Sequence, residues 1–244
     1  MERGILLVFG AEANQEMGCM TERITSRQNP RVKHLLRLRD GSHRRRQGLF
    51  PVEGAREVDR ALATGWPLEC LYYCEELFSG KAAFALLERA ADTDGLECVP
   101  MARDAFLRAA YREGPDGFLA VARRRERDLA DFPLSEVPLL VIAVGIEKPG
   151  NLGAILRTAD AAGCDALLMA DPRCDPFNPN AVRASQGAFF HLPFAVASGE
   201  EVRAFLRERR IEAILTTPAA ETSLYDADLT GPVALVLGAE DRGL

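Results

Sequence analysis

Apolar and polar positions follow one another in blocks that predict alternating helices and strands. Asn29-Pro30 predicts a helix start, because asparagine caps a first turn and proline is tolerated at its first position, and Gly41-Ser42 marks the predicted end. Apolar spacing predicts further helices over 55–63, 81–91 and 103–110, and strands over 68–73, 96–99 and 118–122. This alternation predicts a small α/β sandwich that ends near Arg123-Arg124-Arg125.

The second half begins with an apolar run over 139–144, which is typical of a strand buried on both faces. Further strands are predicted over 166–170, 194–197, 211–215 and 233–237, and helices over 151–162, 178–184 and 201–209. Repeating units of this kind build a parallel sheet covered on both faces. The charged, proline-containing stretch 126–138 is the predicted linker. Residues 1–20 are predicted to be a disordered extension, with Met20 as a candidate start.

The composition is that of a globular protein. The chain has 244 residues, of which 48% are hydrophobic and 27% charged, and its longest apolar run is too short to cross a bilayer. Six cysteines without a C-x-x-C pair are typical of reduced thiols in a cytoplasmic protein. The three histidines are dispersed, so no metal site is predicted.

The charge is distributed unevenly along the chain. Residues 21–48 contain nine lysines or arginines and two acids, a net charge of +7, which leaves −13 for the rest against a total of −6. Such asymmetry favours a basic surface that attracts a polyanion to one end of an acidic body. A solvated basic helix without a function would have the same composition.

The loop after the strand over 139–144 is the most informative segment. It contains Gly150 and Gly153, which permit close backbone approach, and Arg157 follows Asn151 by less than two helical turns. Because loops at the carboxyl ends of parallel strands bind ligands, this one is predicted to handle an anion, although a plain strand–helix connection remains open. No dinucleotide fingerprint and no P-loop sequence is present, which disfavours an unrelated nucleotide-binding enzyme.

The run P-G-N-L-G-A-I-L-R-T over 149–158 resembles the first signature of the SpoU (TrmH-like) RNA 2′-O-ribose methyltransferases of the SPOUT superfamily. Residues 184–193, A-S-Q-G-A-F-F-H-L-P, resemble the family's S-x-G-A-x-F-x-L-P stretch. Residues 236–244, V-L-G-A-E-D-R-G-L, are similar to its second signature. In the first half, the runs over 24–30, 50–58 and 116–121 resemble the family's N-terminal substrate-binding domain.

This resemblance implies an α/β fold with two domains. Residues 21–125 would form a small, ribosomal-protein-like RNA-binding domain, and residues 139–244 a parallel-sheet SPOUT methyltransferase domain. The family's third signature, an Ile-Pro-Met loop followed by Ser-Leu-Asn and a closing helix, is expected beyond Leu244 and would complete a trefoil knot, the cofactor pocket and much of a homodimer contact. The natural gene product is therefore expected to continue.

The resemblance also implies roles for individual residues. Arg157 would ready the ribose 2′-hydroxyl for attack on S-adenosyl-L-methionine, Asn151 would position the ribose or phosphate, and Glu240 would order the site. Cofactor contacts are expected from Gly238, Thr217 and Gly243. The predicted RNA contacts, which share a positive charge, are Arg27, Arg31, Lys33, Arg44, Arg45, Arg46 and Arg56.

The domain arrangement resembles that of enzymes acting on ribosomal RNA, so ribosomal RNA, from the large subunit, is the expected substrate and partner. Two alternatives remain from the sequence. The alternatives to an rRNA enzyme are a tRNA ribose methyltransferase and a catalytically silent RNA-binding scaffold with a degenerate or truncated methyltransferase domain. Three intact site residues, Asn151, Arg157 and Glu240, disfavour the scaffold.

Overall fold

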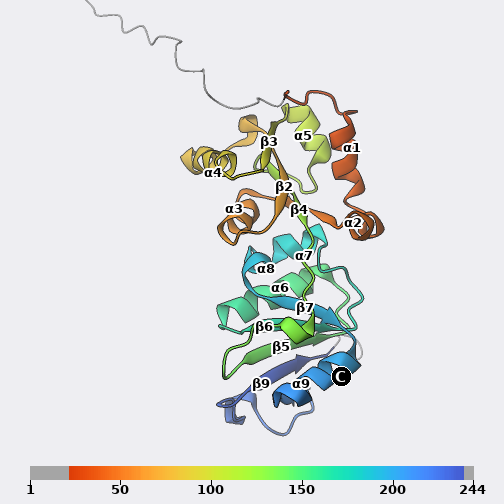
Figure 1. The fold of residues 1–244 in the computed structure, drawn as a ribbon, viewed down its shortest axis with the longest axis vertical. Coiled ribbons are helices and arrows are strands. Elements are labelled where there is room, and N and C mark those ends of the chain that lie inside the picture. Colours follow the sequence, from red (N-terminus) through yellow and green to blue (C-terminus); the bar gives the residue numbers. More distant parts are fainter. Residues whose placement is uncertain (1–21, 239–244) are drawn as a thin grey trace, which may run out of the picture.

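The computed structural model describes residues 22–238, which form two stacked units, each built on its own sheet (Figure 1). We call residues 22–123 the N-terminal unit and residues 139–238 the C-terminal unit. The predicted extension over 1–20 lies outside the described residues. Between residues 22 and 238, no helix is long and apolar enough to cross a membrane.

The N-terminal unit contains α1 (Pro30–Arg37), α2 (Gly41–Gln47), β1 (Leu49–Glu53), α3 (Ala55–Ala63), β2 (Leu68–Tyr73), η1 (Glu75–Leu77), α4 (Lys81–Ala91), β3 (Glu97–Pro100), α5 (Arg103–Ala109) and β4 (Phe118–Arg123). Its sheet has the order β1-β4-β2-β3, in which β4 runs antiparallel to β1 and β2, and β2 runs parallel to β3. The predicted bounds of α3, β2 and α4 are confirmed.

Two predictions for this unit are wrong. The first helix ends at Arg37, and Gly41 begins a second helix instead of ending the first, because the Asp40 side chain accepts a hydrogen bond from the His43 amide and caps a new first turn. The strand β1 was not predicted, because Pro51 and Glu53 interrupt its short apolar run. Pro51 is tolerated there because β1 pairs with β4 alone, at the edge of the sheet.

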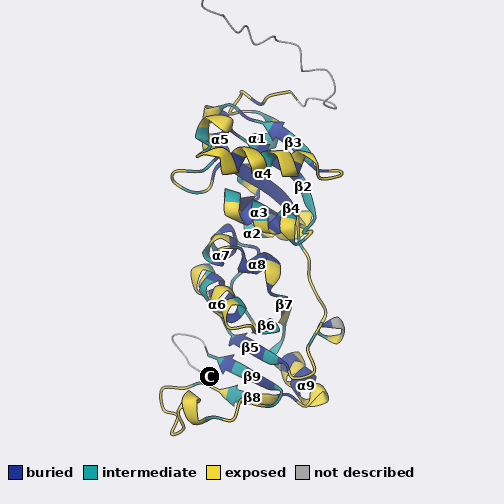
Figure 2. Ribbon diagram, turned by 90° about the vertical axis from the view of Figure 1, so that its left-hand side faces the viewer, coloured by how far each residue is buried: buried dark blue, intermediate teal, exposed yellow. Residues whose placement is uncertain are grey.

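The strand β4 shows how this unit is layered. Phe118 and Ala120 point to the face covered by α3 and α4, whereas Leu119 and Val121 point to the face covered by α1 and α5. The strands of this sheet are buried, and the outer surfaces of the helices are exposed (Figure 2). The basic helices α1 and α2 therefore lie outside the sheet, and most of their lysine and arginine side chains are exposed.

The C-terminal unit contains β5 (Leu139–Val144), α6 (Pro149–Ala161), β6 (Ala166–Ala170), α7 (Pro179–Ala184), α8 (Ala188–His191), β7 (Phe194–Ala197), α9 (Gly199–Arg209), β8 (Glu212–Leu215), η3 (Leu224–Asp226) and β9 (Val233–Leu237). Its strands are all parallel, in the order β7-β6-β5-β9-β8. The predicted parallel sheet is confirmed.

Both faces of this sheet are covered, as the sequence predicts. Val141 of β5 packs beneath α6, α7 and α8, and Ile142 packs toward α9 on the other face. Part of the predicted linker belongs to this second layer: after the short turn η2 (Leu129–Asp131), Phe132 is 3% exposed and packs with the α9 side chains. The stretch between the units is thus partly docked on the C-terminal unit.

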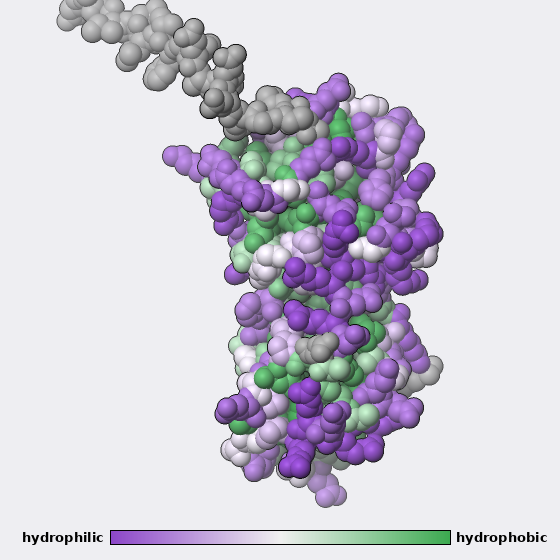
Figure 3. Space-filling view, viewed as in Figure 1, coloured by the Kyte–Doolittle hydropathy of each residue, from purple (hydrophilic) through white to green (hydrophobic). Residues whose placement is uncertain are grey.

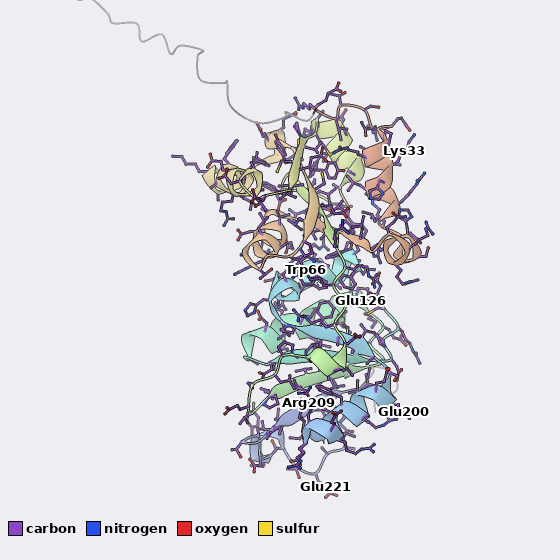
Figure 4. All side chains as sticks on the ribbon, viewed as in Figure 1. Lys33, Trp66, Glu126, Glu200, Arg209 and Glu221 are labelled. Atoms are coloured by element: carbon purple, nitrogen blue, oxygen red, sulfur yellow. The ribbon has the colours of Figure 1, made fainter. Side chains whose placement is uncertain are left out.

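An aromatic cluster joins the two units. Phe50 lies 5.0 Å from Phe177 and 5.6 Å from Phe189, ring centre to ring centre, and Trp66 lies 5.5 Å from Phe189 and 5.4 Å from Phe190. Figure 4 labels Trp66 at this junction. Aromatic contacts of this kind bury large apolar areas, so they stabilise one relative placement of the units.

A buried ion pair lies beside the aromatic cluster. Arg44 donates from Nε and Nη2 to Asp175 Oδ2, at 2.9 and 2.7 Å, and from Nη1 to the carbonyls of Leu38 and Arg39. The Arg44 side chain is 2% exposed, so this location is incompatible with the prediction that Arg44 contacts RNA. Arg124 also donates to Asp175, at 3.3 Å, and its guanidinium lies over the Phe177 ring.

Candidate active site and RNA-facing surface

The strand order of the C-terminal unit creates a switch point between β5 and β9. From β5 the chain continues through α6 to β6 on one side, whereas β9 lies on the other side, with Ala143 opposite Leu237. In open α/β sheets, ligands bind outside the carboxyl ends of the strands at such a point. The segments that follow β5 and β9 therefore form the candidate ligand site.

The loop after β5 is tied to the neighbouring strand. The Gly145 amide donates to the Ala170 carbonyl at 2.8 Å, and the Arg173 amide donates to the Ile146 carbonyl at 2.9 Å. An ion pair between Arg173 and Glu147 adds a side-chain contact across the same gap. The helix α6 begins directly after this loop, at Pro149, so its first-turn amides lie at the switch-point edge of the sheet.

Thr217 and Gly238 reach the same edge of the sheet. Leu215 of β8 lies opposite Val236 of β9, and the Thr216 amide donates to the Val236 carbonyl at 3.0 Å. Thr217 and Gly238, one and two positions further on, therefore follow adjacent strands at the edge where the 145–148 loop lies. The other two expected site residues, Glu240 and Gly243, lie outside the described residues.

Asn151 and Arg157 are both exposed on α6, whose buried side carries Leu152 and Leu156. Six residues along an α-helix correspond to a rise of about 9 Å and to flanks about 120° apart. Arg157 shares its flank with Gly153, one turn earlier, and Gly153 packs against α7. The helix thus presents the two side chains on different flanks, and the long arginine side chain must span the separation between them.

Gly153 explains how closely α6 and α7 approach. A Cβ atom added at Gly153 would lie 2.5 Å from Ala184 Cβ and 2.6 Å from the Ala181 carbonyl. Only glycine permits this contact without a shift of one helix. The position of α7 therefore determines the position of α6 and of the Arg157 backbone.

Five of the predicted RNA contacts have exposed side chains, namely Arg27, Lys33, Arg45, Arg46 and Arg56. Arg31 is half-buried in a bidentate pair with Glu97, with N–O distances of 2.8 and 2.9 Å, and this pair raises the pKa of Arg31 above its usual value. Hydrophilic residues cover the flank where α1 and α2 lie (Figure 3), and Lys33 is labelled on this flank in Figure 4. This flank is on the side toward which the strands of the C-terminal unit point (Figure 1).

Side chains suited to a metal ion do not cluster in the described part of the chain, where no three histidines, cysteines or acids converge. His191 contacts Asp160 of α6 through Nδ1 at 2.5 Å, which links α8 to α6. Burial raises the pKa of the Cys70 thiol to about 12, so this cysteine is not a thiolate nucleophile at neutral pH.

Sequence reasoning missed two residues at the junction of the units. Tyr111, in the loop after α5, accepts a hydrogen bond from Asn180 Nδ2 of α7 at 3.3 Å. Asn180 lies four positions before the stretch over 184–193 that resembles the family, but a single tyrosine in a loop carries no pattern of its own. Only the tertiary contact identifies this pair.

Comparison with known proteins covers both units. Residues 138–244 match the model of the SpoU rRNA Methylase family, and residues 29–120 match that of the MRM3-like substrate binding domain. A 23S rRNA (uridine(2479)-2′-O)-methyltransferase of Streptomyces viridochromogenes is 33% identical over 242 residues, which cover 96% of this chain and 83% of the relative.

Solved structures show the same architecture. The crystal structure of an RNA 2′-O ribose methyltransferase superposes with a TM-score of 0.79 at 38% identity and covers 91% of this chain and 84% of its own. The SpoU methyltransferase AviRb from Streptomyces viridochromogenes, in complex with AdoMet, gives a TM-score of 0.79 at 31% identity and covers 89% and 83%. With sequence and fold matching across both units, this chain belongs to the SpoU rRNA methylase family.

Proposed function

We propose that the protein transfers a methyl group from S-adenosylmethionine to a ribose 2′-hydroxyl of RNA, with ribosomal RNA of the large subunit as the substrate. The observation that carries this proposal is the placement of exposed Asn151 and Arg157 on the helix that begins at the sheet's switch point. The relative from Streptomyces viridochromogenes, which aligns along 96% of the chain, is named for 2′-O-methylation of 23S rRNA. A ribosomal substrate also implies a cytoplasmic enzyme.

The cofactor fits the switch point. Gly238 has no side chain and follows β9, which lies between β5 and β8, and the 145–148 loop and the exposed Thr217 follow these two neighbours of β9. These segments would hold S-adenosylmethionine, together with Glu240 and Gly243. When bound, this cofactor supplies an activated methyl group. The AviRb structure, which contains AdoMet, supports the assignment.

Arg157 would act electrostatically. A ribose hydroxyl is a weak nucleophile and must lose its proton as it reacts. An arginine side chain, which stays protonated in proteins, is a poor base. The guanidinium is suited instead to hold an RNA phosphate and the developing alkoxide together, while the phosphate takes the proton. Asn151 would position the ribose or the phosphate from the other flank of α6.

The N-terminal unit would bind the RNA. We assign residues 21–125 to a substrate-binding domain of ribosomal-protein type, 126–138 to the linker and 139–244 to the methyltransferase domain, in agreement with the matched ranges. The exposed arginines and lysine of α1 and α2 would contact phosphates. We further propose a trefoil knot and a homodimer. Light scattering after gel filtration tests the dimer, and a mass of one protomer would contradict it.

Replacement of Arg157 tests the mechanism. We expect Arg157→Ala to lower kcat about 10²–10³-fold, the loss typical when a group that stabilises developing negative charge is removed. The matched control is Arg207→Ala, an exposed arginine of α9 on the opposite face of the sheet, which should keep full activity. An Arg157→Ala variant that modifies RNA at the wild-type rate would contradict the proposal.

The choice of substrate is tested in cells. Mapping of 2′-O-methylated nucleotides with and without the gene should show one missing methyl group in large-subunit rRNA. Unchanged rRNA methylation together with the loss of a methyl group from tRNA would place the protein in the tRNA-acting branch. Calorimetry addresses the scaffold alternative, because a protein that releases no heat with millimolar S-adenosylmethionine would have no cofactor site.

A further inference from the structure

A second aromatic and basic surface lies at the junction of the units, and of the predicted RNA contacts it includes Arg27. Tyr111 is 40% exposed there, and the Arg39 guanidinium carbon lies 5.7 Å from its ring centre. Its hydroxyl accepts a hydrogen bond from Asn180 of the C-terminal unit. The tyrosine thus bridges the unit assigned to RNA binding and the helix α7, which packs on α6.

The Tyr111 loop is held firmly in place. The buried carboxylate of Glu53 accepts the Tyr111 amide at 2.6 Å and the Arg112 amide at 3.3 Å. Arg39 donates through Nη2 to the carbonyls of Ala109, at 3.2 Å, and Ala110, at 2.5 Å. A ring held in this way loses little conformational entropy when a flat group stacks on it.

A basic hollow adjoins the tyrosine. It has a volume of about 430 Å³ and is lined by Arg27, Arg39, Asp104, Leu107, Arg108 and Ala110. Leu107 is 38% exposed, so the hollow offers an apolar wall as well as three guanidinium groups. Positive groups beside an exposed aromatic ring are the combination that binds single-stranded nucleic acid, through phosphates and a stacked base respectively.

The path from Tyr111 to the proposed catalytic arginine is short and continuous. Asn180 lies at the start of α7, and Ala181 and Ala184 of the same helix contact Gly153. Arg157 follows Gly153 by one turn on the same flank of α6. Four residues of helix rise about 6 Å, so α7 and one turn of α6 separate the tyrosine from Arg157 by a distance that a few nucleotides cover.

We propose that Tyr111 is a stacking platform for an unpaired base next to the methylated nucleotide, and that Arg27 and Arg108 bind the adjoining phosphates. The ligand is single-stranded RNA, because a base inside a duplex cannot offer its face to a tyrosine. This inference rests on the proposed function and adds a positioning residue to it. Asn180 holds the platform in register with the catalytic helix.

Binding of RNA by the full chain, without cofactor, tests the platform. The probes are a fluorescent oligo(U) and a duplex of equal length. The oligo(U) has about 12 nucleotides, which is within the usual range of binding-site lengths on single-stranded nucleic acid. We expect Tyr111→Ala to weaken oligo(U) binding about 5- to 150-fold, as for loss of one stacked base. Tyr111→Phe keeps the ring and should bind within about twofold of wild type. The fluorescence of 2-aminopurine placed in oligo(U) should report stacking when wild type or Tyr111→Phe binds, but not when Tyr111→Ala binds.

The matched control is Phe84→Ala. Phe84 is 49% exposed in α4, on the opposite face of the N-terminal sheet, so its loss should leave RNA binding unchanged. Arg108→Ala should reduce the salt dependence of oligo(U) binding by about 0.7 in slope, the effect of one phosphate contact on a single strand. If Tyr111→Ala does not fold, Tyr111→Leu replaces it in the series.

Several results would overturn the platform. One is that Tyr111→Ala binds oligo(U) as tightly as wild type, and another is that Tyr111→Ala weakens binding of the duplex as much as binding of oligo(U). A third is that Tyr111→Phe loses as much affinity for oligo(U) as Tyr111→Ala, which would mean that the hydroxyl joins the units and the ring does not stack. If the wild-type protein methylates no RNA but Tyr111→Ala still loses oligo(U) binding, the proposed function is refuted and the platform is not. Normal methylation with unchanged binding by Tyr111→Ala would refute the platform alone.

Discussion

Neutralising the Asp175 side chain should weaken the stabilising contact between the two units. The substitution Asp175→Asn removes the charge that pairs with Arg44 while keeping an oxygen for the Phe177 amide, which Asp175 Oδ1 accepts at 3.1 Å. Arg44 would then remain 2% exposed, with the two carbonyls of Leu38 and Arg39 as its remaining acceptors. An uncompensated buried charge is strongly destabilising, because its lost hydration is not replaced.

The expected loss in the free energy of unfolding can be bounded from the structure. Breaking a buried pair by removing one partner costs about 3–5 kcal/mol, and both side chains here are under one-tenth exposed, at 2% and 8%. The control is Glu97→Gln, which breaks the Arg31 pair, whose side chains are 41% and 40% exposed, so it should cost less than about 1 kcal/mol. Because a folded domain has about 5–15 kcal/mol of stability, the Asp175 change should be evident at once.

Urea unfolding with two probes measures this effect. Trp66 is the chain's one tryptophan and packs against Phe189 and Phe190 across the junction, so its fluorescence reports the joining of the units, whereas circular dichroism reports all the helices. Asp175→Asn should lower the free energy of unfolding and move the fluorescence transition to lower urea than the dichroism transition.

A double variant provides the refutation. Arg44→Met with Asp175→Asn leaves no charge of the Arg44–Asp175 pair buried, and it should be more stable than Asp175→Asn alone. The reasoning fails if Asp175→Asn lies within about 1 kcal/mol of wild type, or if the double variant is less stable than the single one.

Two further predictions follow from the packing and the titratable groups. Gly153→Ala should cost about 1–3 kcal/mol of stability and lower methyl transfer, because the new Cβ meets α7 at 2.5 Å. A Cβ added at Gly150 meets nothing within 4 Å, so Gly150→Ala should leave stability unchanged, and equal melting temperatures for the two variants would contradict this. Burial raises the pKa of Glu57 above its ordinary 4.5, so the folded state binds more protons and stability falls as pH rises from 4.5 through the raised value. Glu57→Gln should therefore gain stability relative to wild type between pH 5 and pH 8 in urea unfolding, and an advantage that does not grow with pH would refute the assignment.

Local pattern determined much of this protein. The bounds of β5 and α4 follow from apolar spacing, and the proposed ligand-binding end of the parallel sheet follows from the position of the glycine-containing loop after β5. These features depend on the periods of a helix and a strand, which neighbouring residues encode. The family resemblance rests likewise on short runs such as that over 149–158.

The tertiary structure alone decided the roles of individual charged and aromatic side chains. Arg44 and Arg45 are adjacent in a basic run, yet one is buried against Asp175 and the other is exposed. The contact of Tyr111 with Asn180 joins residues 69 positions apart. Partners so distant along the chain leave no periodic trace, because they meet only when the two sheets pack together. That packing selects which arginines lose water and which remain exposed.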